Sequence, residues 1–210
     1  LLQAVNSISA SWADYDNDGW LDLFICCERQ PSRLFHNERN GKFRDVAEQA
    51  GLPIQQFDCK GSAWIDYDND GFRDLFLNYL RPDLRAKLMR NNGNGTFLDV
   101  TRDLGVDGPA EGFSCWAWDY DNDGWEDLFA TSYDRTVADV VRGFTGMNHS
   151  LQTNRLFRNR NGEGFDDKTK EAGLDMVFAT MGSNFGDFDN VGFLDMYLGT
   201  GEPNLAMLVP

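Results

Sequence analysis

The sequence predicts an all-β fold, a β-propeller built of four-stranded antiparallel blades, and three observations support this prediction. An acidic segment recurs four times, beginning at Asp14, Asp66, Asp119 and Asp187. The first three copies have a period of about 50 residues, which is typical of propeller blades, and an insert lengthens the last spacing. Each complete repeat holds four short runs of apolar and aromatic residues that are separated by turn signals. The repeats lack the amphipathic 3.6-residue periodicity that a helical solenoid would need.

The elements follow one order in every complete repeat. A strand of small and aromatic residues leads into the acidic loop, a second strand follows at once, and third and fourth strands form a hairpin before a short turn or helical stub. Asn-Gly and Gly-x-Gly segments mark the tight turns, because Asn and Gly tolerate positive φ. The second strands are expected to begin at Asp22, Asp74, Asp127 and Asp195, the third strands to cover 33–37, 87–91 and 155–159, and the fourth strands to cover 42–46, 96–100 and 164–167.

The repeats define the expected blades of a single partial propeller domain. Blade 1 covers about 7–53, blade 2 about 57–108, blade 3 about 111–175 with an insert at about 134–153, and blade 4 about 177–210. Blade 4 lacks the third-strand and hairpin motifs, so about three and a half blades are expected in this chain. Open blade edges are normally paired or covered. The remaining blades are therefore expected in deleted chain, in disordered chain or in a partner subunit, and the abrupt ends favour an internal piece of a longer chain.

The acidic loops have the ligand pattern of calcium sites. The first three read D-Y-D-N-D-G, and another aspartate follows three residues after the glycine. Carboxylates at positions 1, 3, 5 and 9 make the oxygen-rich cage that Ca²⁺ prefers, and Gly at position 6 lets the backbone carbonyl of position 7 point inward. The expected ligands are the side chains of Asp14, Asp16, Asp18, Asp22, Asp66, Asp68, Asp70, Asp74, Asp119, Asp121, Asp123 and Asp127, with the backbone oxygens of Trp20, Phe72 and Trp125.

The fourth loop departs from this pattern. It keeps Asp187, Asp189 and Asp195, with the backbone oxygen of Phe193, but has Val191 at position 5. A site with one carboxylate fewer is weaker. We therefore expect three Ca²⁺ sites, and binding at the fourth loop is left open.

EF-hand loops begin in the same way and are the main structural alternative. An EF-hand needs a bidentate Glu at position 12, which is occupied here by Ile25, Leu77 and Ala130. These apolar side chains cannot bind a cation, and the flanking segments read as strands. The pattern thus excludes EF-hands.

The chain is strongly acidic, with 34 acidic and 19 basic residues and a formal net charge of −15. A surface of this sign repels nucleic acids and anionic membranes. No apolar run reaches the length of about 20 residues that a membrane-spanning helix needs. The sequence therefore predicts neither a nucleic-acid partner nor membrane insertion.

The repeats resemble the FG-GAP/VCBS family, which includes the integrin α-like propellers. Blade 3 carries D-Y-D-N-D-G-x-x-D-L-F, R-L-F-R-N, G-x-G-F-x-D and T-x-x-A-G-L in this order, from Asp119 to Leu174. The combination is similar to the secreted branch of cartilage acidic protein-like chains, which often carry an ASPIC/UnbV segment. The resemblance implies a seven-bladed propeller, Ca²⁺ in the loops between the first two strands of its blades, and an extracellular, cell-surface or periplasmic location.

No catalytic residue is predicted. The two histidines, His36 and His149, lack a nucleophile pattern nearby, and no G-x-S-x-G, phosphate-binding loop or zinc spacing occurs. The leading hypothesis is a non-enzymatic calcium-binding scaffold for adhesion, protein–protein interaction or assembly, with a protein or glycan partner. Two alternatives are a module of a larger secreted enzyme or sugar-binding protein, and a subunit of a filament or oligomer that self-associates through open blade edges.

The aromatic residues at loop position 7 have two interpretations. Trp20, Phe72, Trp125 and Phe193 either pack against their own blades or form a row for binding on the loop face. Of these two interpretations, packing of each ring against its own blade is favoured.

The four cysteines, Cys26, Cys27, Cys59 and Cys115, also leave alternatives open. The second strand of one blade ends where the first strand of the next begins, so Cys26 or Cys27 is expected to approach Cys59. Both a disulfide in an oxidising compartment and buried thiols are compatible with this arrangement.

Overall fold

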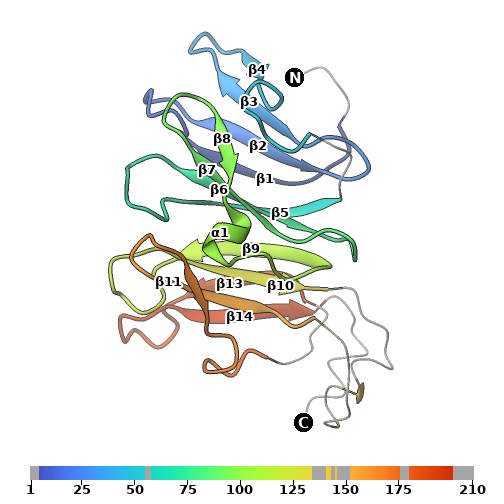
Figure 1. The fold of residues 1–210 in the computed structure, drawn as a ribbon, viewed down its shortest axis with the longest axis vertical. Helices are drawn as coiled ribbons and strands as arrows, with labels where there is room; N and C mark the ends of the chain where they lie inside the picture. The colour runs from blue at the N-terminus through green and yellow to red at the C-terminus, as the bar shows by residue number, and fades with distance from the viewer. Residues whose placement is uncertain are drawn as a thin grey trace.

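The described part of the chain, residues 5–54, 58–133, 141–142, 145, 152–175 and 180–200, forms four antiparallel β-sheets in the computed structural model (Figure 1). The first sheet contains β1 (Ser7–Ala13), β2 (Asp22–Cys27), β3 (Arg33–Asn37) and β4 (Phe43–Asp45). The second contains β5 (Cys59–Ile65), β6 (Asp74–Tyr79), β7 (Lys87–Asn91) and β8 (Phe97–Asp99), and the short helix α1 (Thr101–Leu104) follows it. The third contains β9 (Gly112–Trp118), β10 (Asp127–Ser132), β11 (Arg155–Asn159) and β12 (Phe165–Asp167), and the fourth contains β13 (Thr180–Gly186) and β14 (Asp195–Thr200). The prediction of an all-β antiparallel fold is confirmed.

The first three sheets repeat one topology and one register. Their strands lie in chain order, and every residue of β2, β6 and β10 is buried. These second strands have a strand neighbour on each side and packed side chains on both faces, which explains why they read as continuous apolar runs. The hairpin of the third and fourth strands pairs Asn37 with Phe43, Asn91 with Phe97 and Asn159 with Phe165.

Neighbouring sheets bury their faces against one another, in chain order along the long axis of the molecule (Figure 1). Burying each large apolar side chain stabilises the fold by about 1.5–3 kcal/mol. Three clusters join successive sheets, and they include Phe24 with Leu75, Phe76 with Leu128, and Phe129 with Met196.

The first strands of the sheets meet along one line, with β5 contacting β1 and β9, and β9 contacting β13. The hydroxyl oxygens of Ser11 and Ser62 lie 2.9 Å apart, and those of Ser114 and Ser183 lie 2.8 Å apart. The backbones approach so closely that a β-carbon on Gly61 would lie 2.5 Å from the carbonyl oxygen of Phe113. An arrangement in which the first strands meet is consistent with successive propeller blades.

Some sequence predictions fall on other parts of the chain. The insert at about 134–153 lies largely outside the described residues, and so does the end of the expected blade 4 at 201–210. The blade boundaries and the number of blades remain predictions. Among the described residues, the structure contains no helix that is long and apolar enough to span a bilayer.

Candidate metal centres

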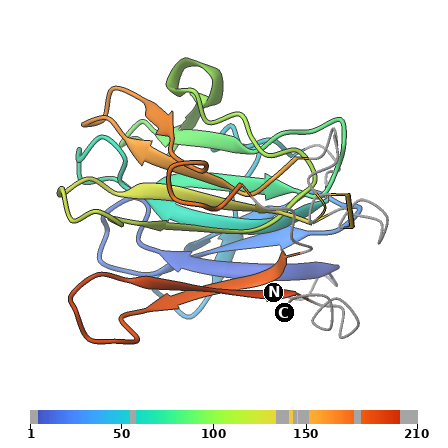
Figure 2. The same cartoon turned by 90° about the horizontal axis from the view of Figure 1, so that it is seen from below.

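The four acidic loops lie side by side at one end of the sheets. They connect β1 to β2, β5 to β6, β9 to β10 and β13 to β14. All four project on the left in both ribbon views (Figures 1 and 2). The repeated topology therefore places the predicted ligands in a row of neighbouring loops.

The aspartate at position 1 shapes each loop by accepting hydrogen bonds from its backbone. Asp14 Oδ1 accepts from the N–H of Asp18 at 2.9 Å, and Asp14 Oδ2 accepts from the N–H of Gly19 at 2.8 Å. Gly19 has a φ of 87°, in the left-handed region that favours glycine. The same contacts recur around Asp119 and Asp187. Position 1 therefore turns the loop so that positions 3 and 5 face its interior.

The aspartate at position 9 begins the second strand and is fully buried in the three complete loops. Each of these carboxylates accepts a 2.7 Å hydrogen bond from the backbone N–H of the asparagine that ends the third strand. Loss of hydration disfavours the charged form. Burial raises the pKa of Asp22 to about 6, that of Asp74 to about 8 and that of Asp127 to about 6. A negative charge at position 9 is therefore costly in the metal-free loop.

The aspartate at position 3 has an unused oxygen in all three complete loops. The Oδ1 atoms of Asp16, Asp68 and Asp121 are buried and have no hydrogen-bond partner, as is also the case for Oδ1 of Asp66 at position 1. Most buried polar atoms in folded proteins are hydrogen-bonded. The same unpaired atom in three loops is a feature that a cation would explain.

The structure brings most of the predicted ligands together. One carboxylate oxygen of each member lies within 4.8 Å of the others in four groups: Asp14, Asp16 and Asp18; Asp66, Asp68 and Asp70; Asp119, Asp121 and Asp127; Asp187, Asp189 and Asp195. Asp22, Asp74 and Asp123 are not in these groups, and Asp22 instead groups with Asp16 and His36. The backbone N–H groups of Trp20, Phe72 and Trp125 donate to the position-5 carboxylates of their loops, while ligation by the carbonyl oxygens of position 7 stays a prediction.

Two arginines that the sequence patterns did not single out reach into the second and third loops. Arg90 Nε lies 3.1 Å from Asp68 Oδ2. Arg158 Nε lies 2.5 Å from Asp121 Oδ2, and its Nη2 lies 2.7 Å from Asp123 Oδ2. These partly exposed guanidinium groups offset some of the repulsion between the carboxylates. Their signal in the sequence is the basic residue that precedes the last asparagine of each third-strand motif.

The asparagine at position 4 links each loop to the next one, and this role was also missed. It adopts a left-handed conformation in all four loops, with φ between 54° and 61°. Its side-chain amide donates to the carbonyl oxygen of the position-6 glycine in the following loop. These bonds are Asn17 to Gly71 at 2.8 Å, Asn69 to Gly124 at 3.3 Å and Asn122 to Gly192 at 3.4 Å. The recurrence of Asn in every copy was the available signal.

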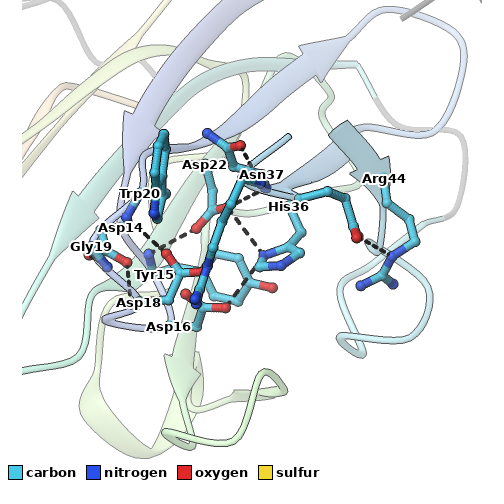
Figure 3. A network of polar contacts seen from close by, with 12 residues as sticks. Asp14, Tyr15, Asp16, Asp18, Gly19, Trp20, Asp22, His36, Asn37 and Arg44 are labelled. Atoms are coloured by element: carbon cyan, nitrogen blue, oxygen red, sulfur yellow. Dashed lines mark hydrogen bonds and ion pairs between the residues drawn. The ribbon is translucent and has the colours of Figure 1, made fainter. Parts of the chain in front are cut away.

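The first loop has a histidine, His36, beside its carboxylates (Figure 3). The second and third loops have an arginine at the equivalent position. His36 Nδ1 lies 3.3 Å from Asp22 Oδ1 and 3.4 Å from Asp16 Oδ2. Arg39 instead reaches this loop, with its Nη2 2.6 Å from Asp18 Oδ2. The first loop therefore has a donor set that differs from those of its neighbours.

The position-7 aromatic rings do not share one environment. The ring of Phe72 lies over Gly93 and that of Trp125 lies over Gly162, so closely that a β-carbon on either glycine would be within 3.1 Å of the ring. Trp20 and Phe193 are 49% and 54% exposed. Phe72 and Trp125 therefore pack against their own sheets, as the sequence favoured. Trp20 and Phe193 expose about half of their surface to solvent.

Comparison with known proteins gives relatives along most of the chain. Cartilage acidic protein 1 from Mus musculus is 29% identical over 186 residues, which cover 86% of this chain and 27% of that protein. The same protein from Xenopus tropicalis is 28% identical over 192 residues, covering 89% and 27%. The chain thus spans about a quarter of the length of these relatives.

Among solved structures, one titled for the recognition of non-reducing terminal N-acetylglucosamine by an Agrocybe aegerita lectin is similar, with a TM-score of 0.49 and 16% identity. The likeness covers 92% of this chain and 47% of that chain. The model of the FG-GAP-like repeat family matches residues 14–77 and 66–130, which contain the three complete acidic loops and the strands β2 to β9. The chain therefore belongs to the FG-GAP-like repeat family, as a propeller-type repeat domain similar to cartilage acidic protein 1.

Proposed function

We propose that this chain is a calcium-binding FG-GAP repeat domain that acts outside the cell as a non-enzymatic scaffold for adhesion, protein–protein interaction or assembly. One observation carries the calcium part: the buried, unpaired Oδ1 of Asp16, Asp68 and Asp121. An unpaired buried carboxylate oxygen costs free energy. A cation bound in each loop would remove that cost.

The donor chemistry of the second and third loops suits calcium. Their donors are carboxylate and backbone oxygens, which are the ligands that a hard cation such as Ca²⁺ prefers. The proposed shells combine the aspartates at positions 1, 3, 5 and 9 with the carbonyl oxygen of position 7. Loop four keeps a group of three aspartates but exposes Val191 at position 5, which supports a weaker site there.

The proposed role of the ions is structural. Each loop is hydrogen-bonded to the next one through its position-4 asparagine. A loop that is fixed by an ion therefore also limits the movement of the loop beside it. A rigid row of loops of this kind supports the proposal of a scaffold that presents one face to a protein or glycan partner.

The proposed extracellular location is supported by the relatives, which carry the name cartilage acidic protein 1. Extracellular calcium-binding modules work at millimolar calcium, a concentration at which sites with many carboxylates are filled. The strong negative charge makes nucleic acid an unsuitable partner.

Two further functions have an observation in their favour. Because the chain spans about a quarter of its relatives, it can serve as one module of a larger secreted enzyme or sugar-binding protein. Self-association is favoured by the fourth sheet, where Phe188, Val191 and Tyr197 are all more than 60% exposed. Mass measurement in solution separates these two: a stable monomer contradicts self-association.

The metal sites are tested by elemental analysis and titration calorimetry on protein stripped with a chelator. We expect three tightly bound Ca²⁺ ions per chain. Asp121→Ala should remove one of them, whereas Asp166→Ala, at an exposed position outside the loops, should remove none. Absence of calcium binding, or a preference for zinc at the second and third loops, would overturn the proposal.

The scaffold role is tested separately, with arrays of extracellular matrix proteins and glycans probed in calcium and in chelator. Binding that needs calcium supports the role. Equal binding in both conditions would mean that the loop face is not the contact surface.

A further inference from the structure

The third strand of the first sheet carries a histidine beside its acidic loop. The third strands of the second and third sheets carry an arginine at the equivalent position. His36, Arg90 and Arg158 each precede the asparagine that ends their strand, so they occupy equivalent places. An arginine stays protonated and cannot bind a metal ion. A neutral histidine, in contrast, is a common metal ligand. The two residue types therefore give their loops different chemistry.

His36 is placed and oriented as a ligand (Figure 3). One ligand atom from each of His36, Asp16 and Asp22 lies within 4.8 Å of the other two. His36 Nδ1 and Asp16 Oδ1 are both buried, and neither has a hydrogen-bond partner. The imidazole packs edge-on against the ring of Tyr15, with ring centroids 6.3 Å apart and an interplanar angle of 82°. Packing thus holds an unused nitrogen donor beside two carboxylates.

The neighbouring arginine leaves this nitrogen available. Arg39 donates two hydrogen bonds to Asp18 Oδ2, at 2.9 Å from Nε and 2.6 Å from Nη2. The position-5 carboxylate of the first loop therefore has a cationic partner that is independent of His36. In the second and third loops the arginine of the third strand itself lies near the position-5 carboxylate, with Arg90 Nη2 3.9 Å from Asp70 Oδ2 and Arg158 Nη2 2.7 Å from Asp123 Oδ2.

We infer that the first acidic loop is a mixed nitrogen–oxygen site that binds a divalent transition-metal ion, in preference to Ca²⁺, through His36 Nδ1 and the carboxylates of Asp16 and Asp22. One imidazole with carboxylates suits Zn²⁺, which accepts nitrogen and oxygen ligands together. Ca²⁺ gains little from a nitrogen donor, so it fills this loop only when no transition metal competes. This inference rests on the proposed function, because it assigns a different ion to one of its three complete loops.

The test uses the stripped protein in excess Ca²⁺, titrated with Zn²⁺, with bound zinc and calcium counted by elemental analysis. Co²⁺ is added in parallel, because its visible absorption reports nitrogen ligation. Wild-type protein should bind one Zn²⁺ per chain and release one Ca²⁺. His36→Arg, which installs the residue type of the other loops, should weaken zinc binding more than about tenfold and leave the two other calcium sites filled.

Two further variants test whether the histidine of the third strand is what gives an acidic loop its affinity for zinc. Arg90→His should give the second loop a zinc site as well, because it supplies the same nitrogen donor. His149→Ala, which removes the other histidine of the chain, should leave zinc binding unchanged. Zinc binding that survives His36→Arg overturns the inference, and so does a wild-type protein that binds calcium in three loops and no zinc. A protein that binds no calcium at the second and third loops contradicts the proposed function instead.

Discussion

The side-chain amide of Asn91 donates a 2.7 Å hydrogen bond to the main-chain carbonyl oxygen of Tyr15, across the boundary between the second and first sheets. The same amide donates to the carbonyl oxygen of Arg73 in its own sheet at 3.1 Å. Asn159 repeats the contact one sheet later, donating to the carbonyl oxygen of Tyr67 at 2.8 Å. The asparagine that ends a third strand therefore holds the acidic loop of the preceding sheet.

Replacing Asn91 with alanine should lower the free energy of unfolding by about 1–3 kcal/mol, because the carbonyl oxygen of Tyr15 would stay buried without its donor. Urea denaturation measures this change. Asn92→Ala is the matched control, since Asn92 is exposed and its side-chain amide donates to nearby Thr96. Equal effects of the two substitutions would show that the contact between the sheets adds no stability.

Removal of calcium should lower the melting temperature. A site that is saturated at about one hundred times its dissociation constant stabilises the folded state by about 2.7 kcal/mol, which is worth roughly 5–10 °C in a domain of this size. Thermal melts with and without chelator measure the shift. Added Ca²⁺ should restore the curve, and the same concentration of Mg²⁺ should not, because Mg²⁺ requires a smaller octahedral shell. A curve that chelator leaves unmoved contradicts the calcium proposal.

Asp70→Ala should reproduce part of this loss in calcium but not in chelator. With the ion bound, the variant lacks one ligand, so we expect up to about 3 kcal/mol less stability. Without the ion, removing a charge beside Asp66 and Asp68 relieves repulsion and offsets the lost hydrogen bond from the backbone N–H of Phe72. Denaturation in both conditions gives the comparison.

The control for Asp70→Ala is Asp83→Ala, at an exposed aspartate paired with Arg81 outside the loops. It should change stability by less than about 1 kcal/mol in either condition. If Asp70→Ala is equally destabilising with and without calcium, its role is structural and does not involve a metal ion.

Cys26 and Cys59 lie in different sheets with their sulfur atoms 3.1 Å apart, and both are fully buried. All four cysteines are thiols in this structure, and the Cys27 sulfur lies 3.8 Å from the carbonyl oxygen of Ile25. The sequence predicted that either Cys26 or Cys27 lies near Cys59, and the structure places Cys26 there.

Refolding in a glutathione redox buffer should join Cys26 to Cys59. Their two thiols are oxidised, and oxidised glutathione takes up the two electrons and two protons. Such a link typically stabilises a fold by about 2–4 kcal/mol. Thiol titration and non-reducing peptide maps identify the pair: Cys27→Ser should retain the link and Cys26→Ser should lose it. A map that joins Cys27 to Cys59, or an unchanged thiol count, contradicts this prediction.

The strands could be predicted closely because each repeat carries its own local signals. The third strands expected at 33–37, 87–91 and 155–159 coincide with β3, β7 and β11. The fourth strands are one or two residues shorter than predicted: each begins one residue later, after the hairpin turn, and the first two also end one residue earlier. The closing segments, expected as short turns or helical stubs, are turns except for α1, because segments this short rarely make a stable helix.

The carboxylates of the loops were also predictable, because their spacing alone brings them together. The roles of Arg90, Arg158 and Asn69 were not, since each acts on a residue far away in the sequence. Asn69, for example, bonds to Gly124 in the next repeat. The contact of Asn69 depends on how sheets are stacked, and the contacts of the two arginines depend on how strands pair within a sheet. No local pattern specifies either arrangement.

The bonds between sheets also have a direction. Asn91 reaches back to the loop before it, while Asn17 and Asn69 reach forward to the loop after them. The two sides of each sheet are therefore unlike, and every sheet meets its neighbour head to tail. A head-to-tail contact repeated with a constant rotation closes into a ring when the rotation divides a full turn, and otherwise grows as an open spiral. The angle between neighbouring sheets therefore decides whether an array of such sheets closes into a ring and how many sheets the ring contains; no new kind of contact is needed.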